Sequence, residues 1–179
     1  IDIGTRQQCN EIIQQNSDLL LKLIDDVVDL SSLEIGKMQF QFGNSDAVAI
    51  CRNVVDTVEK IKQTSAAVLF QTSHEKMEIY TDEARLQQLL INLLITATKF
   101  TTEGSITLLL EKESEEMTVF SVTDTGCGIA PEKQGQIFNR FEKLNENAQG
   151  SGLGLSICQL IVERFGGRKW IDQEYKDGS

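Results

Sequence analysis

The sequence predicts a mixed α/β (α+β) chain in which one long N-terminal helix precedes alternating helices and strands. Three observations support this prediction. An apolar stripe with spacings of three and four residues runs through residues 5–32, which is typical of an amphipathic helix. Short strand-like apolar runs alternate with helical patterns from residue 47 onward. There are also two glycine-rich turns: the one at residues 126–128 follows a strand-like run, and the one at residues 150–154 precedes a helical run.

The composition disfavours several classes of function. The chain of 179 residues carries 27 acidic and 17 basic residues, a net charge of −10, so no nucleic-acid partner is expected. Four cysteines without CxxC spacing and a single histidine indicate reduced thiols rather than a zinc site or a disulfide framework. No apolar stretch reaches the ~18 residues of a membrane span, and no signal peptide opens the sequence.

The segment 5–32 is predicted to be one uninterrupted helix, because it contains neither proline nor glycine. A helix of ~28 residues is about 40 Å long at 1.5 Å per residue. Its one-sided apolar stripe needs a partner, and both packing on its own domain and pairing with helices of another chain are open. The stripe consists of Ile12, Ile13, Leu19, Leu20, Leu23, Ile24, Val27 and Leu30.

The next helix is predicted over residues 47–62, after a linker with a short strand at residues 38–42. Ser45 and Asp46 precede this helix and can cap it. Its apolar face carries Val48, Cys51, Val54, Val55 and Val58.

Later elements follow the same logic. Asp82 can cap a helix over residues 83–98, Pro131 can start a short helix, and a helical apolar run covers residues 155–165. Strand-like runs lie at residues 68–71, 77–81, 105–112, 117–123 and 168–174.

A nucleotide site is predicted where the glycine-rich turns meet these elements. Asp124 ends a strand-like run, and Gly126 and Gly128 follow it at a bend where glycine permits positive φ and a close ligand. The glycines at 150–154 precede a helix N-terminus, whose unpaired N–H groups suit a phosphate. The P-loop motif Gly-x-x-x-x-Gly-Lys-Ser/Thr is absent from the sequence. The Gly-x-Gly-x-x-Gly fingerprint does not fit either, because Leu155 stands where its third glycine would be.

These motifs resemble those of the sensor histidine kinases. Residues 124–128, Asp-Thr-Gly-Cys-Gly, resemble the G1 box, Phe138 and Phe141 the F box, residues 150–155 the G2 box, and residues 92–101 the N box. The resemblance covers residues 5–179 and implies a two-layer sandwich in which helices cover a mixed sheet. Gyrase-type and chaperone ATPases share this fold.

The resemblance also implies roles for the N-box helix and the first glycine turn. Asp124 is expected to accept a hydrogen bond from the adenine amino group, while Gly126 and Gly128 let the base lie against the backbone. Asn92 and Lys99 are expected to contact the phosphates of ATP, and Asn92 also faces Mg²⁺. Thr96 stands where the family has a second magnesium-site asparagine. Its shorter hydroxyl reaches the ion directly, acts through a water, or fails to reach it.

The remaining implied site residues belong to the F box and the second glycine turn. Phe138 and Phe141 are expected to pack at the base of a mobile lid over residues 142–149. Lys143 would lie near the phosphates. Helix N–H groups at Gly152, Leu153 and Gly154 would bind them.

By the same resemblance, residues 1–35 form the second helix of a dimerisation and phosphotransfer hairpin whose acceptor-histidine helix is absent. Residues 36–179 form the ATP-binding domain without its final strand. The implied activity is that of an ATP-dependent protein-histidine kinase, with ATP and Mg²⁺, a response regulator or receiver domain, and a homodimer through the N-terminal helix. The implied location is the cytoplasmic portion of a membrane-associated bacterial sensor.

The only histidine, His74, is not expected to be the phosphoacceptor. It lies between two strand-like runs, whereas the family's acceptor precedes the dimerisation helix. The chain alone is therefore not expected to autophosphorylate.

Two other functions compete with the kinase. The threonine at position 96 suggests a nucleotide-binding but catalytically weak regulatory module. A gyrase-type ATPase is disfavoured, because it uses a glutamate on this helix to activate water and an amide cannot act as a general base.

Overall fold

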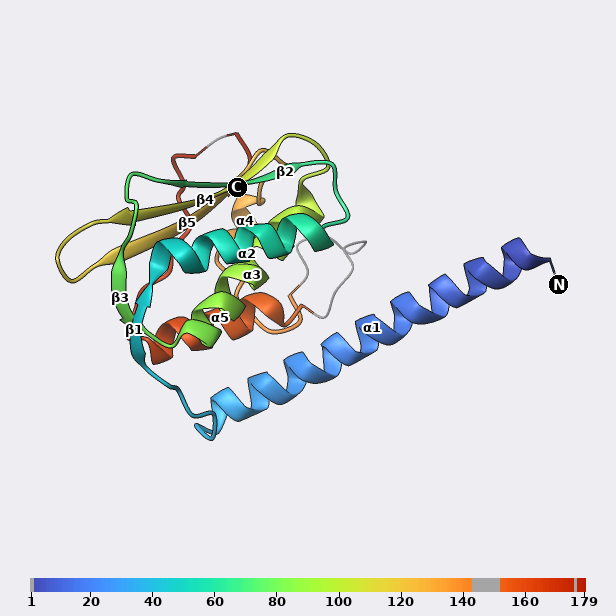
Figure 1. Cartoon of the computed structure of the whole chain (residues 1–179), viewed down its shortest axis with the longest axis horizontal. Helices are drawn as coiled ribbons and strands as arrows, with labels where there is room; N and C mark the ends of the chain where they lie inside the picture. Colours follow the sequence, from blue (N-terminus) through green and yellow to red (C-terminus); the bar gives the residue numbers. More distant parts are fainter. Residues whose placement is uncertain (1, 143–151, 176) are drawn as a thin grey trace.

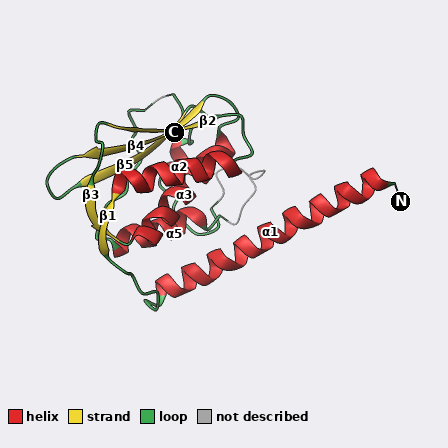
Figure 2. Cartoon of the chain, viewed as in Figure 1, coloured by secondary structure: helices red, strands yellow, loops and turns green. Residues whose placement is uncertain are grey.

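The computed structural model describes residues 2–142, 152–175 and 177–179. A long helix, α1 (Ile3–Glu34), extends away from a body in which helices lie against a sheet (Figures 1 and 2). This arrangement confirms the predicted two-layer fold with a long N-terminal helix.

The main sheet is mixed. Its strands are β2 (Ala67–Thr72), β4 (Ser105–Lys112) and β5 (Thr118–Asp124), in the order β2-β4-β5. β4 pairs in parallel with β2 and antiparallel with β5. β1 (Gly43–Asp46) and β3 (Glu78–Thr81) form a separate antiparallel pair, so the strands on either side of the turn at residues 73–77 join different sheets.

Asp46 holds β3 beside β1. Its carboxylate accepts the N–H of Val48 at 3.1 Å, which caps α2 (Ala47–Ile61), and the N–H of Met77 at 3.0 Å. The backbone N–H of Ala47 donates in turn to the Met77 carbonyl at 2.8 Å. The bond from Met77, more than any other contact, lowers the pKa of Asp46, so the capping carboxylate stays ionised.

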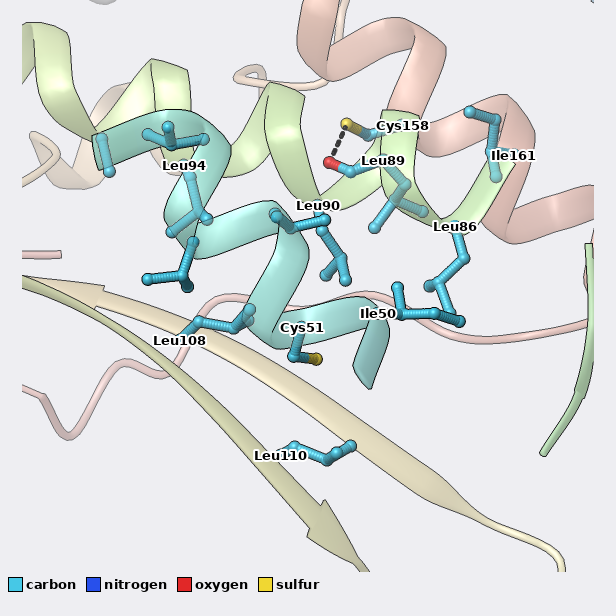
Figure 3. Packing of buried hydrophobic residues seen from close by; sticks show 14 of the residues in the cluster. Ile50, Cys51, Leu86, Leu89, Leu90, Leu94, Leu108, Leu110, Cys158 and Ile161 are labelled. Atoms are coloured by element: carbon cyan, nitrogen blue, oxygen red, sulfur yellow. Dashed lines mark hydrogen bonds between the residues drawn. The ribbon is translucent and has the colours of Figure 1, made fainter. Parts of the chain in front are cut away.

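Two helices, α2 and α3 (Glu83–Phe100), pack on one face of the main sheet, and α5 (Gly154–Arg164) packs against α3 on the same side (Figure 1). Asp82 caps α3 as predicted, with its carboxylate accepting the N–H of Arg85 at 3.1 Å. The one-turn helix α4 (Pro131–Gln134) begins at the proline. Figure 3 shows the packed interior, which includes Ile50, Leu86, Leu90, Leu94, Leu108, Leu110 and Ile161.

Two buried cysteines belong to this interior. The Cys158 thiol donates to the Leu89 carbonyl at 3.5 Å, joining α5 to α3 (Figure 3). Desolvation raises the pKa of both Cys51 and Cys158 to about 12, so both stay protonated and unreactive at neutral pH.

The C-terminal end of α1 is attached to the body, whereas most of its apolar stripe faces solvent. Leu30 and Leu33 are buried in the core. The Gln88 side chain on α3 donates to Asp29 at 2.6 Å, and Glu34 pairs with Arg140. The exposed members of the predicted stripe are Ile12, Ile13, Leu19, Leu20, Leu23, Ile24 and Val27.

The predicted strand at residues 38–42 is wrong, because pairing begins only at Gly43. The aromatic side chains in this linker pack on one another and on the end of α5 instead. Phe40 and Phe42 stack with ring centroids 6.0 Å apart, and both meet the ring of Phe165 at 5.8 Å. The alternation of aromatic residues therefore reflects packing of a loop rather than a ladder.

The predicted strand at residues 168–174 is also wrong, because these residues form no ladder. Its side chains are mostly exposed, and Trp170 is 60 % exposed. The run thus lacks the buried face that stabilises a strand.

None of the described helices, α1 included, combines the length and hydropathy needed to cross a membrane.

Candidate functional site

The carboxylate of Asp124 lies at the end of β5 and is only 3 % exposed. A buried carboxylate needs hydrogen-bond donors, because desolvation otherwise disfavours its charge. One oxygen accepts the N–H of Gly126 at 2.8 Å, and the other accepts the hydroxyl of Ser179. A carboxylate offers about four lone-pair sites, so acceptor capacity remains for a ligand.

The first glycine turn is pressed against the end of α3. A Cβ on Gly126 would lie 2.2 Å from the Phe100 carbonyl oxygen and 2.8 Å from an oxygen of Asp124. Gly128 has φ +72°, which disfavours other residues. The N–H of Cys127 donates to the same Phe100 carbonyl at 3.3 Å. Glycine is therefore required at position 126 because of the close approach to α3, and at position 128 because of the backbone conformation.

Asn92 connects α3 to the second glycine turn. Its side chain is 7 % exposed, and its amide nitrogen donates to the carbonyl of Gly154, the first residue of α5, at 3.4 Å. Two motifs 62 residues apart in the sequence are thereby brought together. The bond leaves the amide oxygen of Asn92 as the acceptor for a further partner.

Thr96 lies one turn after Asn92 and folds back on its own helix. Its hydroxyl donates to the Asn92 carbonyl at 2.7 Å. This local bond is common for threonine inside helices and holds the short side chain close to the backbone. Lys99 follows in the last turn of α3 with an exposed side chain.

The described residues hold no group of three histidine, cysteine, aspartate or glutamate side chains suited to a metal ion. Oxygens of Asn92 and Thr96 are the donors predicted from the sequence. Mg²⁺ usually keeps several waters and binds substrate phosphates with only one or two protein ligands. The oxygen donors on α3 therefore fit a Mg²⁺ ion whose other ligands are phosphate oxygens and waters.

The two F-box aromatics have different surroundings, and only Phe141 is seen in contact with the second glycine turn. Phe138 is half-buried, and the Lys169 ammonium lies 4.4 Å from its ring centroid. Phe141 is 66 % exposed and has φ 57°, and its N–H donates to the Gly152 carbonyl at 3.0 Å. A Cβ on Gly152 would lie 2.9 Å from the Phe141 backbone, so this contact requires glycine there.

The remaining predicted site residues belong to the second glycine turn and to the predicted lid. Leu153 is fully buried just before α5. Lys143, Gly150 and the predicted lid after Glu142 lie outside the described residues.

The C-terminal residues also belong to the site, although no sequence motif predicted them. The backbone N–H of Asp124 donates to the Ser179 carbonyl at 2.6 Å, and the Tyr175 hydroxyl donates to the Asp124 carbonyl at 3.0 Å. A Cβ on Gly178 would lie 2.0 Å from that carbonyl oxygen. Gly178 was the one available signal, since glycine often marks close backbone approach, but a glycine does not reveal its neighbour.

Together these residues supply a buried acceptor, a helix N-terminus and a lysine. The acceptor suits an amino group on a base, while the N-terminus of α5 and Lys99 suit phosphates. The arrangement offers binding groups for a nucleotide.

Comparison with known proteins gives a family match over more than half of the chain. Residues 81–179 match the model of the histidine kinase-, DNA gyrase B- and HSP90-like ATPases. This range contains α3, both glycine turns and the C-terminal residues that contact Asp124.

Individual proteins extend the similarity towards the N-terminus. The chain is 33 % identical over 175 residues to the circadian input-output histidine kinase CikA of Synechococcus elongatus, covering 93 % of this chain and 23 % of CikA. The structure of full-length ShkA in complex with AMPPNP has a TM-score of 0.80 at 27 % identity, over 93 % of this chain and 35 % of ShkA. Histidine kinase ThkA in complex with response regulator protein TrrA has a TM-score of 0.71 at 27 % identity, over 93 % and 47 %. The chain thus spans less than half of each of these proteins.

The crowding at Gly126 leads to a stability prediction. Gly126→Ala forces its new Cβ into the Phe100 carbonyl and the Asp124 carboxylate, and overpacking of this kind costs about 1–3 kcal/mol. Gly135→Ala is the matched control, because a Cβ there meets nothing within 4 Å and should change stability by less than about 0.5 kcal/mol. Urea unfolding of both variants measures the difference, and equal midpoints would contradict the packing seen at Gly126.

Proposed function

The chain belongs to the family of histidine kinase-, DNA gyrase B- and HSP90-like ATPases, and from this premise we propose that it is the ATP-binding catalytic region of a sensor histidine kinase. In this proposal it donates the γ-phosphoryl group of ATP to a histidine outside these 179 residues. In the next step of this proposal, the phosphoryl group passes from that histidine to a response regulator or receiver domain. The similar ShkA structure is a complex with AMPPNP and the similar ThkA structure is a complex with a response regulator, which supports this class of ligand and partner.

The contact between Asn92 and Gly154 is the observation that carries this proposal. It places the only buried asparagine of α3 against the first residue of α5. The N-cap residue of α5, Leu153, has no polar side chain to cap the helix, and the N–H groups of a helix start are suited to phosphate oxygens. The asparagine and the helix start thus act on the same part of the ligand.

The other end of the site suits adenine. The Asp124 carboxylate is buried, and an acceptor in such a place discriminates in favour of a base that carries an amino group. In this proposal the base lies beside the turn of Gly126 and Gly128, whose backbone is held by the close approach to α3 at Gly126 and by the positive φ of Gly128.

Phosphoryl transfer requires positioning and charge stabilisation more than a protein nucleophile. Asn92, the helix start of α5 and Lys99 can orient the phosphates, and a bound Mg²⁺ would neutralise their charge. His74 does not enter this scheme. It lies in the turn before β3, with its ring Nδ1 3.3 Å from the Ser73 hydroxyl and its backbone N–H donating to the Thr72 hydroxyl.

We also propose that α1 pairs with helices of a second copy in the whole protein. The exposed stripe from Ile12 to Val27 supports this, because a helix with so much unpartnered apolar surface is not stable alone in water. In this division residues 1–35 serve dimerisation and phosphotransfer and residues 36–179 bind ATP. The protein would be the cytoplasmic portion of a membrane-associated sensor.

A second candidate function is a nucleotide-binding but catalytically weak regulatory module. The hydrogen bond from Thr96 to the Asn92 carbonyl favours it, since it holds the hydroxyl against the helix rather than towards a ligand. In this case the chain binds ATP or ADP but supports little phosphoryl transfer.

Nucleotide recognition is tested at Asp124. Asp124→Asn is expected to weaken ADP binding by about 1–3 kcal/mol, because a buried hydrogen bond to a charged group is lost. Isothermal titration calorimetry measures the dissociation constants. Asp56→Asn on the exposed face of α2 is the control. Equal affinities for the wild type and Asp124→Asn would remove adenine recognition from Asp124.

Phosphoryl acceptance is tested on the chain by itself. Incubated with γ-labelled ATP and Mg²⁺, the chain is expected to incorporate no label, because its only histidine lies in a turn away from the site. Mass spectrometry under alkaline conditions, which preserve phosphohistidine, detects any product. His74→Gln gives the background, and label found on His74 would contradict the proposed location of the acceptor.

The magnesium site is tested at Thr96. The affinity for a non-hydrolysable ATP analogue is measured once with Mg²⁺ and once with EDTA, and the ratio of the two is the gain from Mg²⁺. Thr96→Asn supplies a longer side chain with an amide oxygen, so it is expected to increase this gain. A tenfold increase corresponds to about 1.4 kcal/mol. Thr98→Asn is the matched control, because Thr98 lies on the same helix and its hydroxyl likewise donates to a backbone carbonyl, that of Ile95, at 2.6 Å. An unchanged gain from Mg²⁺ in Thr96→Asn would show that the threonine hydroxyl supports Mg²⁺ binding as well as an asparagine does.

A further inference from the structure

The C-terminal residues hold the backbone of Asp124 from both sides. We name Tyr175, Gly178 and Ser179 the C-terminal strap. Ser179 accepts the backbone N–H of Asp124 at 2.6 Å, and Tyr175 donates to the Asp124 carbonyl at 3.0 Å. Gly178 lies so close that a Cβ would meet the Asp124 carbonyl oxygen at 2.0 Å. The strap therefore restrains the residue that ends β5.

The two hydroxyls of the strap act on different parts of Asp124. Ser179 donates to a carboxylate oxygen and so occupies acceptor capacity that a ligand also needs. Tyr175 donates to the backbone carbonyl of Asp124, and its hydroxyl also has a hydrogen bond with the Thr123 side chain. The bond to the carbonyl restrains the backbone from which the Asp124 side chain extends, and it occupies neither carboxylate oxygen.

We propose that Tyr175 is a positioning residue that holds Asp124 in place to recognise the exocyclic amino group of adenine. This inference rests on the proposed nucleotide-binding function and deepens it. A phenol is suited to the task, because its rigid ring reaches a distant carbonyl with only two side-chain torsions to restrict. A hydrogen bond to a base also requires the acceptor to stay within a fraction of an ångström of its place.

The surroundings keep the Tyr175 hydroxyl protonated. Desolvation, followed by the nearby carboxylates of Asp177 and Asp124, raises the pKa of Tyr175 above its ordinary value. The group is therefore a hydrogen-bond donor throughout the neutral range, in agreement with its contact to the Asp124 carbonyl.

The test compares ADP with inosine 5′-diphosphate, which has a carbonyl oxygen where ADP has the amino group. Calorimetric titrations use the wild-type chain, Tyr175→Phe and Tyr80→Phe. Tyr80 is the matched control, because it is the only other tyrosine, is 71 % exposed and stacks on Phe42 away from Asp124.

Tyr175→Phe removes one hydrogen bond and should raise the dissociation constant for ADP about three- to tenfold. The constant for inosine 5′-diphosphate should change less than about twofold, because the lost restraint serves the amino group. Tyr80→Phe should change neither constant. In an Asp124→Asn background the Tyr175→Phe change should have no further effect on the ratio of the two constants, since the two residues act as a unit.

Two results would overturn the inference. One is an unchanged preference for ADP in Tyr175→Phe. The other is an equal loss of both nucleotides together with a lower thermal midpoint, which would show that the hydroxyl serves stability alone. A wild-type chain that binds no ADP would instead refute the proposed function, so the two failures are distinguishable.

Discussion

The buried carboxylate of Asp124 is the constraint on which the site depends. A charge in such a place is unfavourable unless hydrogen-bond donors surround it, and the chain supplies them from two segments far apart in sequence. Gly126 donates from the turn directly after β5, and Ser179 donates from the C-terminal residues. Both contacts need close backbone approach, which explains the glycines at positions 126 and 178. The end of β5, the end of α3 and the C-terminal strap thus share one packing arrangement.

The second half of the site depends on how α3 and α5 pack. The buried thiol of Cys158 on α5 donates to the Leu89 carbonyl on α3, and one turn further along the Asn92 side chain donates to Gly154. The Thr96 hydroxyl bonds within α3, to the Asn92 carbonyl. We propose that a threonine at this position affects the Mg²⁺ affinity of the site and leaves the packing of α3 on α5 in place.

α1 joins the same frame at one end only. Leu30 and Leu33 are part of the core, and the Asp29–Gln88 bond and the Glu34–Arg140 pair connect the end of α1 to α3 and to the segment before Phe141. Towards its N-terminus the apolar stripe is exposed. A displacement of α1 would thus act on α5, against which α1 packs, and through the two side-chain contacts on α3 and the segment before Phe141.

Local patterns in the sequence were sufficient for the helices, their caps and most strands. Asp46 and Asp82 cap α2 and α3 as predicted, and the period of the apolar residues identified the buried faces, because caps and periodicity act between neighbours in the chain. The sequence also pointed to Asn92, Asp124 and the glycine turns as one site. Only the tertiary structure decided that β3 pairs with β1, that residues 38–42 and 168–174 form no strands, and that Tyr175 and Ser179 contact Asp124. These features depend on which distant segment offers a free edge, a ring or a hydrogen-bond partner, and no local pattern encodes that choice.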